Sequence, residues 1–411
     1  MATPMTQIAY LVPEFPGQTH NFFWREIQAL RNMGVRVNFV STRRPPKGLM
    51  STSWGSRAMD QTSYLYPLRL RELPFTLGIL LTAGPLAWCE CLRGIWCAVG
   101  VTPRQRIKML GLILMAAKLV HTARLQGWQH VHVHSCADAA NVALFAKWLG
   151  GIKYSLTLHN PLAVYGGNQR QKWRHATFGI VITHAILDDV RRTLQGNLPP
   201  QIEVAPMGVD ASVFSRTSPY LPYEGHGALR VFCCARLNPC KGHRFLVEAI
   251  DLLRREGMSI LLEIAGEDDV GGFGYRCELE ALIRSRGLEG HVSLLGAVSE
   301  EVVRERLTRA HVFVLASLAE PLGVAIMEAM SMEVPVVATR AGGVPELISD
   351  GQDGILVPPS DPVSIARALR AIATNPGTAE SLGESARRKV VDKYSVDGSA
   401  KAIGRLVFAS A

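Results

Sequence analysis

Short apolar runs alternate with longer amphipathic stretches along most of the chain. This alternation is typical of parallel sheets whose strands are joined by helices. Helices are predicted over residues 22–33, 245–254 and 324–332, where apolar positions recur at helical spacing. The clearest strands are predicted at residues 8–12, 35–40, 131–134, 154–158, 179–184, 229–234, 261–266, 311–316 and 335–339. The predicted fold class is therefore α/β, with sheets of the doubly wound kind.

A stretch rich in Ser, Pro, Tyr and Gly divides the chain. Residues 215–228 predict a linker, because these residue types favour turns over helices and strands. The first domain is then predicted at residues 1–214 and the second at 229–392. A length of 411 residues is enough for two or three domains with proper cores.

The first domain contains an apolar segment that does not fit the strand and helix alternation. Residues 67–125 predict an inserted pair of helices, whose apolar runs are shorter than the roughly 20 residues that cross a membrane. Two interpretations stay open, namely helices lying on a membrane surface and helices packed in the domain core. The basic residues beside the apolar runs are Arg69, Arg71, Arg93, Arg104, Arg106 and Lys108.

Charge is distributed unevenly between the two halves of the chain. Residues 1–200 carry a net charge of +14, and residues 201–411 carry −5. A basic first half predicts an anionic partner, for which an anionic membrane surface, a polyphosphate-linked lipid and an acidic polysaccharide all qualify. Nucleic acid is not expected, because no nucleic-acid-binding motif accompanies the charge.

Cysteine usage and the N-terminus favour a cytoplasmic protein. The eight cysteines lack paired Cys-x-x-Cys spacing, so neither a zinc site nor a disulfide framework is expected, and a reducing compartment fits. The first residues run into a strand without the features of a signal peptide. The chain also lacks a dinucleotide-binding Gly-x-Gly-x-x-Gly and a Walker phosphate loop, which excludes two common nucleotide sites.

Two acidic residues bracket the start of the helix predicted over 324–332. Glu320 precedes this helix, and Glu328 lies inside it in an apolar run where an ordinary solvated acid is not expected. Gly323 lets the backbone approach a ligand, and the N–H groups at the helix start are suited to an anion. Glu328 is then placed to bind what lies beside the anion, such as two vicinal hydroxyls.

A second pair of charged residues lies in the loop after the strand at 229–234. Arg236 and Lys241 stand five residues apart, just before a predicted helix. This arrangement aims a guanidinium, an ammonium and a helix N-terminus at one anion, which suits a diphosphate. The acidic residues at 267–269 follow the next strand and predict a solvated turn, with metal binding as the alternative.

These motifs resemble those of a known family. The run from Ser317 to Thr339 resembles the Glu-x7-Glu signature of the retaining glycosyltransferase family four, which has the GT-B fold. The segments at 341–348 and 353–359 continue the resemblance, and Phe15 to Ile27 resembles exopolysaccharide transferases, including the colanic-acid type. The resemblance implies two Rossmann-like domains facing across a cleft, with a helix at 393–411 that crosses back to the first domain.

The resemblance also implies roles for individual residues. Arg236 and Lys241 would bind the donor diphosphate, Glu328 the ribose and Glu320 the donor sugar. The backbone near Val298 would hold the nucleobase, and the helix start at Gly323 and Val324 would complete the donor site. The expected catalytic residues are His159, Glu320, Arg236 and Lys241, and neither a metal nor another cofactor is expected.

On the acceptor side the resemblance is less regular. His159 would touch the donor sugar from the first domain, but Asn160 follows it where Asp is common in the family. The residues expected to face the acceptor are Gln18, Thr19 and His20, in a loop where relatives carry other residues. Pro321 and Met207 replace a glycine and an asparagine that are usual at those places.

Taken together, these features predict a retaining glycosyltransferase. It would move a sugar from a nucleoside-diphosphate sugar to a lipid-linked or growing polysaccharide acceptor in exopolysaccharide or cell-surface glycan synthesis. The predicted location is the cytoplasm, including the inner face of the plasma membrane. Two alternatives stay open: a nucleotide-sugar epimerase of the GT-B fold, and a non-catalytic protein of the membrane surface.

Overall fold

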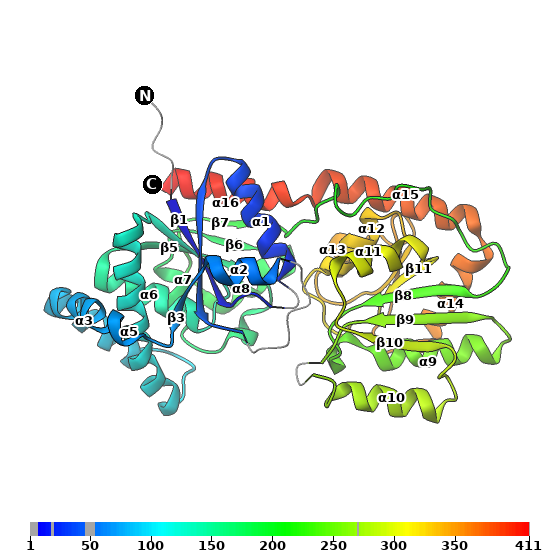
Figure 1. The fold of residues 1–411 in the computed structure, drawn as a ribbon, viewed down its shortest axis with the longest axis horizontal. Coiled ribbons are helices and arrows are strands. Elements are labelled where there is room, and N and C mark those ends of the chain that lie inside the picture. Colours follow the sequence, from blue (N-terminus) through cyan, green and yellow to red (C-terminus); the bar gives the residue numbers. More distant parts are fainter. Residues whose placement is uncertain (1–6, 18–19, 46–53, 269–270, 411) are drawn as a thin grey trace. The chain divides into compact units, whose positions relative to one another are not determined.

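The computed structural model describes residues 7–17, 20–45, 54–268 and 271–410 (Figure 1). The described residues form two compact units, each built on its own parallel sheet. The first unit holds residues up to 206 together with those from 399 onward, and the second holds residues 207–398. Each unit has helices on both faces of its sheet, which confirms the predicted α/β class.

The first sheet has seven strands in the order β3-β2-β1-β4-β5-β6-β7, and every neighbouring pair is parallel. Its central strands are buried on both faces, as expected for a sheet covered by helices. The sequence pattern did not predict β3 or β7, two short strands at the sheet edges. The strands are β1 (Gln7–Glu14), β2 (Arg36–Arg43), β3 (Thr62–Tyr66), β4 (His130–His134), β5 (Lys153–Leu158), β6 (Gly179–Val181) and β7 (Ile202–Val204).

Helices connect these strands and begin and end at recognisable signals. Helix α5, for example, begins at a capping box between Thr102 and Gln105 and ends at Gly127 in the left-handed conformation. Outside the insert the helices are α1 (Asn21–Asn32), α2 (Gly55–Gln61), α6 (Asp138–Gly150), α7 (Gln169–Arg174), α8 (His184–Leu194) and α16 (Val396–Ser410).

The insert comprises three helices rather than the predicted pair. They are α3 (Leu73–Thr82), α4 (Gly84–Trp96) and α5 (Pro103–Gln126). Gly84 adopts φ +79° and is followed by Pro85, and this combination breaks the helix between α3 and α4. Within the described residues no single helix is both long and apolar enough to cross a membrane. Residues 70–82 and 84–96 reach that standard only when taken together, and their axes are bent by 97°.

The second sheet has six parallel strands in the order β10-β9-β8-β11-β12-β13. The strands are β8 (Leu229–Cys234), β9 (Ile260–Ala265), β10 (Val292–Gly296), β11 (Val312–Leu315), β12 (Val336–Thr339) and β13 (Ile355–Val357). The helices are α9 (His243–Arg255), α10 (Tyr275–Ser285), α11 (Glu300–Arg309), α12 (Val324–Ser331), α13 (Val344–Leu347), α14 (Pro362–Thr374) and α15 (Pro376–Lys393).

The boundary between the units differs from the one predicted at residue 214. Residues 207–214 belong to the second unit, where the Val209 N–H donates to the carbonyl of Tyr394 at 2.9 Å. The segment 215–228, predicted as a linker, also packs on this unit. Its Arg216 donates to the carbonyls of Leu307 and Met332, at 3.3 and 3.1 Å. Helix α16 packs in the first unit, where Arg405 and Glu203 form an ion pair of 2.5 Å.

Candidate functional site

In both sheets the strand order reverses beside the first strand. The reversal lies between β1 and β4 in the first sheet and between β8 and β11 in the second. In open α/β sheets, ligands bind outside the carboxyl ends of the strands at such a switch point. Most of the residues predicted to bind the donor follow β8 and β11, and His159 follows β5 next to β4.

In the second unit, Lys241 and Glu320 form an ion pair at the switch point. The Lys241 Nζ lies 2.7 Å from the Glu320 Oε2, although the two residues are 79 positions apart in the chain. The Ser317 hydroxyl donates to the same carboxylate oxygen at 2.9 Å. Both charged side chains are largely buried, at 18% and 8% exposure. The structure thus places one basic and one acidic residue of the two predicted motifs in direct contact.

Close backbone contacts hold this pair in place. The Leu318 N–H donates to the Cys240 carbonyl at 2.7 Å, which ties the loop after β11 to the loop after β8. A Cβ on Gly242 would lie only 1.9 Å from the Ala316 carbonyl oxygen, so a side chain there would force the loops apart. A Cβ on Gly342 would likewise lie 2.1 Å from the carbonyl oxygen of Glu320.

Helix α12 begins beside the ion pair. Gly323 precedes it with φ +98°, a conformation that residues with side chains rarely adopt. The helix start carries unpaired N–H groups and the positive end of the helix dipole, both of which favour an anion. Val324 is the first residue of the helix and is half-buried.

The remaining donor residues lie on neighbouring loops of the same sheet edge. Arg236 is exposed in the loop after β8. A Cβ on Gly266, which follows β9, would lie 1.9 Å from the carbonyl oxygen of Ala235, the residue before Arg236. Glu328 is buried in α12 at 9% exposure. Burial raises the pKa of Cys234 at the end of β8, and the charge of nearby Glu328 raises it further, which places Glu328 beside β8.

Val298 lies farther along the same edge. It follows β10, which is separated from β8 by β9, and its side chain is half-buried. The structure thus brings Lys241 and Glu320 into direct contact and sets Glu328 beside β8. Among the described residues no hydrogen bond links Val298 to this group, and its assignment to the nucleobase stays a prediction.

In the first unit, His159 follows β5 and belongs to a group of aromatic rings. Its Nε2 lies 2.9 Å from the Nδ1 of His134, and its ring centroid is 5.3 Å from that of Phe22 at the start of α1. Burial lowers the pKa of His159 to about 3, with a smaller contribution from His20, so the ring is neutral at physiological pH. The neighbouring Asn160 donates to the Tyr165 hydroxyl at 3.2 Å.

The predicted acceptor-side residues are described only in part. Gln18 and Thr19 lie outside the described residues. His20 precedes α1 and stacks on Phe15, with ring centroids 5.9 Å apart. It also meets the edge of Phe23 at 5.0 Å, and Phe23 in turn contacts His159 at 5.4 Å. His20 and His159 therefore share a neighbour in the first unit.

Sequence reasoning missed a buried polar network beneath His159. The Tyr10 hydroxyl donates to the Glu26 Oε2 at 2.5 Å, and the same oxygen lies 3.5 Å from the Nε2 of His134. The His-x-His-x-His pattern of residues 130–134 was the available signal. In a strand this spacing places all three side chains on one face, where a polar cluster is unusual.

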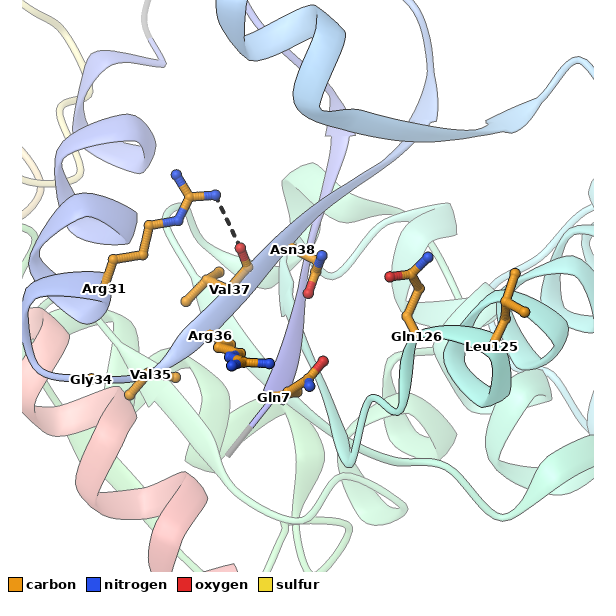
Figure 2. Close-up of a pocket in the computed structure, with 9 residues that line it drawn as sticks. All are labelled: Gln7, Arg31, Gly34, Val35, Arg36, Val37, Asn38, Leu125 and Gln126. Atoms are coloured by element: carbon orange, nitrogen blue, oxygen red, sulfur yellow. Dashed lines mark hydrogen bonds between the residues drawn. The ribbon is translucent and has the colours of Figure 1, made fainter. Parts of the chain in front are cut away.

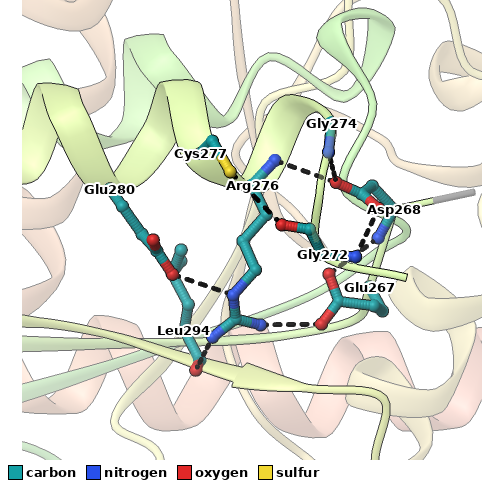
Figure 3. Close-up of polar contacts among 8 residues, drawn as sticks. All are labelled: Glu267, Asp268, Gly272, Gly274, Arg276, Cys277, Glu280 and Leu294. Atoms are coloured by element: carbon teal, nitrogen blue, oxygen red, sulfur yellow. Dashed lines mark hydrogen bonds and ion pairs between the residues drawn. The ribbon is translucent and has the colours of Figure 1, made fainter. Parts of the chain in front are cut away.

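The acidic residues after β9 have a structural role instead of forming a solvated turn. Figure 3 shows Asp268 accepting the backbone N–H groups of Gly272 and Gly274, at 2.7 and 2.9 Å, and Glu267 paired with Arg276 at 2.7 Å. Asp268 is buried at 4% exposure, which contradicts the predicted solvated position. These oxygens are already engaged with donors, and Asp269 lies outside the described residues.

A hollow of about 700 Å³ lies at the end of the first sheet where the strands begin, opposite their carboxyl ends (Figure 2). Gln7 and Arg36, which line it, are the first residues of β1 and β2. Arg31 donates to the Val37 carbonyl at its rim, at 3.0 Å. The predicted ligand site lies at the carboxyl ends of the strands, so this hollow at their amino ends is distinct from it.

Residues 225–389 match the model of a protein family described as Glycosyl transferases group 1. This region contains Arg236, Lys241, Glu320 and Glu328, and it coincides with most of the second unit.

Curated relatives are similar to part of the chain. The putative colanic acid biosynthesis glycosyltransferase WcaL of Salmonella typhimurium is 33% identical over 206 residues, 48% of either chain. The alpha-D-kanosaminyltransferase of Streptomyces kanamyceticus is 34% identical over 169 residues, 41% of this chain and 42% of the relative. The chain thus spans about half the length of these relatives. The alpha-maltose-1-phosphate synthase of Mycobacterium tuberculosis is 28% identical over 321 residues, 71% of this chain and 82% of the relative.

Solved structures resemble almost the whole chain. HepE of Anabaena, in complex with UDP and glucose, has a TM-score of 0.73 at 18% identity and covers 98% of this chain and all of its own. Sucrose-phosphate synthase of Thermosynechococcus elongatus has a TM-score of 0.72 at 20% identity and covers 99% of this chain and all of its own. These likenesses show that the fold is GT-B, with two Rossmann-like domains.

Proposed function

We propose that the protein is a retaining glycosyltransferase, which moves a sugar from a nucleoside-diphosphate sugar to a hydroxyl of a glycan acceptor. The observation that carries the proposal is the Lys241–Glu320 ion pair beside the start of α12, at the switch point of the second sheet. An ammonium, an exposed guanidinium on Arg236 and a helix N-terminus on one sheet edge suit a diphosphate. The similarity to group 1 glycosyltransferases supports the same reaction class.

The chemistry of the transfer explains why these groups are needed. Breaking the bond between the anomeric carbon and the diphosphate leaves negative charge on the diphosphate and positive charge on the sugar. Lys241 and Arg236 would stabilise the leaving diphosphate as its charge develops. Glu320 would then hold Lys241 in position and accept hydrogen bonds from hydroxyl groups of the sugar, while Glu328 would bind the ribose. In this scheme the cationic side chains stabilise the diphosphate without a metal ion. We therefore expect transfer to proceed in the presence of EDTA.

The identity of the donor and acceptor is proposed from the relatives. HepE was solved with UDP and glucose, so uridine-diphosphate sugars are the first donors to test. Colanic acid and amylovoran transferases are among the relatives, which supports a growing or lipid-linked polysaccharide as the acceptor. His159 would orient the donor sugar, and the loop with Gln18, Thr19 and His20 would face the acceptor.

Binding of UDP followed by calorimetry tests the donor site. We expect wild-type protein to bind UDP and Lys241→Met to lose most of this affinity. Lys389→Met is the matched control, because Lys389 pairs with Asp353 at 2.9 Å with 16% and 8% exposure, almost as Lys241 pairs with Glu320. Both variants lose a largely buried ion pair, but only one lies at the proposed site. Equal UDP binding by both variants would overturn the donor site.

Product analysis tests the reaction itself. Sugar nucleotides are incubated with a lipid-linked acceptor, and NMR of the product reports the configuration at the anomeric carbon. Retention is expected, and inversion contradicts the proposal. Isomerisation of the donor without an acceptor would instead identify an epimerase, and failure to bind any nucleoside diphosphate would favour the non-catalytic alternative.

A peripheral membrane location is also proposed, because the insert exposes apolar and basic side chains together. Ten of the 21 large apolar side chains exposed among the described residues lie between residues 70 and 110, including Leu81, Leu86 and Trp96 at 82–84% exposure. The exposed basic residues in and beside the same region are Arg69, Arg71, Arg93, Arg104 and Lys108, against one exposed acid, Glu90. Exposed apolar side chains together with basic ones complement an anionic lipid surface.

Vesicle flotation tests this location. The protein is expected to float with vesicles containing phosphatidylglycerol at low salt, and less with pure phosphatidylcholine. Leu81→Ser combined with Trp96→Ser is expected to abolish flotation. Phe273→Ser is the control, since Phe273 is 88% exposed and lies in the second unit. No flotation of wild-type protein at low salt, or equal flotation of both variants, would reject the proposed membrane surface.

A further inference from the structure

Glu26 is a buried carboxylate with no role in the mechanism described so far. It lies on α1 of the first unit at 6% exposure, and its Oε2 accepts the Tyr10 hydroxyl at 2.5 Å. The Ser399 hydroxyl of the last segment also bonds to this carboxylate. Burial raises the pKa of Glu26, and its bonds with the Tyr10 and Ser399 hydroxyls oppose part of this rise.

His134 lies between Glu26 and His159. Its Nε2 is 3.5 Å from the Glu26 Oε2, and its Nδ1 is 2.9 Å from the His159 Nε2. The ring of Tyr10 stacks on His134 with centroids 4.1 Å apart, which fixes the plane of the imidazole. Burial lowers the pKa of His134, and the neighbouring His132, His159 and His20 lower it further, so His134 is neutral.

The tautomers of His134 and His159 follow from the position of His134 between Glu26 and His159. A neutral imidazole carries one N–H and one lone pair. The Glu26 Oε2 accepts the Tyr10 hydroxyl and also faces Nε2 of His134, which favours the proton on that nitrogen and leaves Nδ1 as an acceptor. His159 must then donate from Nε2, and its Nδ1 keeps a lone pair.

Two ring nitrogens of His134 and His159 are screened from solvent and have no hydrogen-bond partner among the described residues. One is His134 Nε2, which faces the Glu26 carboxyl group at 3.5 Å, and the other is His159 Nδ1, which faces no such group. His132, by contrast, uses both ring nitrogens, with Ser155 at 2.7 Å and Thr157 at 2.9 Å. A buried acceptor without a partner costs free energy, so it indicates a position at which a ligand supplies the missing donor.

We propose that Glu26 and His134 are positioning residues, which hold His159 in the tautomer whose Nδ1 accepts a hydrogen bond from a hydroxyl of the bound sugar. The proposal rests on the proposed function for the identity of the ligand, but the tautomer itself does not depend on it. The Glu26–His134–His159 chain parallels the way a carboxylate orients a catalytic imidazole in other enzymes.

Nitrogen-15 NMR of histidine-labelled protein tests the tautomer directly. The His159 resonances are assigned by their loss in His159→Gln. In wild-type protein we expect an unprotonated Nδ1 and a protonated Nε2 at His159. The opposite tautomer in wild-type protein would overturn the proposal, whatever the enzyme does.

Glu26→Gln tests whether the carboxylate is the cause. We expect the single tautomer of His159 to be lost and kcat/KM for the donor to fall by about 10- to 100-fold, the size seen when a group that orients a ligating histidine is removed. Tyr10→Phe keeps the carboxylate and is expected to keep the tautomer. An unchanged tautomer with unchanged kcat/KM in Glu26→Gln would refute the role of Glu26.

Ser155→Ala controls for general destabilisation. Its hydroxyl bonds His130 and His132, each at 2.7 Å, in the same buried strand pair but outside the chain to His159. We expect lower stability with unchanged His159 resonances. If Ser155→Ala lowers kcat/KM as much as Glu26→Gln at equal loss of stability, the network is only structural and the proposal is wrong. Absence of turnover by wild-type protein with the expected tautomer present would instead reject the proposed function.

Discussion

Acidification from about pH 7.5 to about pH 5 is expected to destabilise the first unit, because the fold keeps several histidines neutral there. Burial lowers the pKa of His130 to about 3, with a smaller contribution from Lys153, whereas a histidine in an unfolded chain titrates near 6.5. The stabilisation is therefore complete above about pH 6.5 and is lost as the pH falls toward 3. At about pH 5, one extra proton on the unfolded chain costs roughly 2 kcal/mol.

Other titrating groups of the buried network change the loss of stability on acidification in known directions. His159 has a pKa lowered to about 3 by burial, and His132 and His134 are shifted the same way. His130 and His159 alone would together cost about 4 kcal/mol at about pH 5, a large part of the stability of a domain, and His132 and His134 add to the loss. Glu26 acts in the opposite sense, because its raised pKa means that the folded state takes up a proton earlier. It offsets part of the loss.

Urea denaturation across this pH range measures the free energy of unfolding. Hydrogen exchange in peptides of β4 and β5 shows whether the loss of stability lies in this part of the first unit. His130→Gln removes one titrating site and is expected to reduce the slope of stability against pH by about 1.4 kcal/mol per pH unit below about pH 6. His226→Gln is the control, because His226 is exposed.

Carboxylates whose pKa is lowered in the folded state do not contribute in this pH range. Glu72, whose pKa is lowered through its bond with Lys118 despite some burial, loses its contribution only below about pH 4.5. A stability that stays constant between about pH 7.5 and about pH 5, or a slope left unchanged by His130→Gln, would refute the reasoning.

Three further predictions concern the second unit. Arg236→Ala and Lys241→Ala are each expected to lower kcat by about 10²- to 10³-fold, as for the loss of an oxyanion donor, and near-normal turnover of the double variant would contradict the mechanism. Gly242→Ala is expected to cost about 3 kcal/mol or more in urea denaturation, because its Cβ would meet a carbonyl oxygen at 1.9 Å. Gly34→Ala, also at positive φ but with no atom within 4 Å, is its control and should cost about 1 kcal/mol. Asp251→Asn is expected to cost about 2–3 kcal/mol, because this buried carboxylate pairs with three arginines, and an unchanged denaturation midpoint would count against it.

Local pattern was enough to place many of the elements. Helix α12 was predicted at residues 324–332 and is found at Val324–Ser331, and β12 lies within the run predicted at 335–339. The apolar spacing that specifies such elements involves residues only a few positions apart, so it is visible in the sequence. The same spacing did not show β3 or β7, because these edge strands mix polar with apolar residues and are only partly buried.

The amino-acid sequence by itself determined the chemistry available to the candidate site: the acids Glu320 and Glu328 around one helix start, and the bases Arg236 and Lys241 in another loop. Only the tertiary structure decided that Lys241 meets Glu320 across 79 residues, and that Glu26 lies 3.5 Å from His134. The order of the strands and the close backbone contacts at glycines bring these residues together. Both features depend on packing between segments that are far apart in the chain, which no local sequence pattern shows.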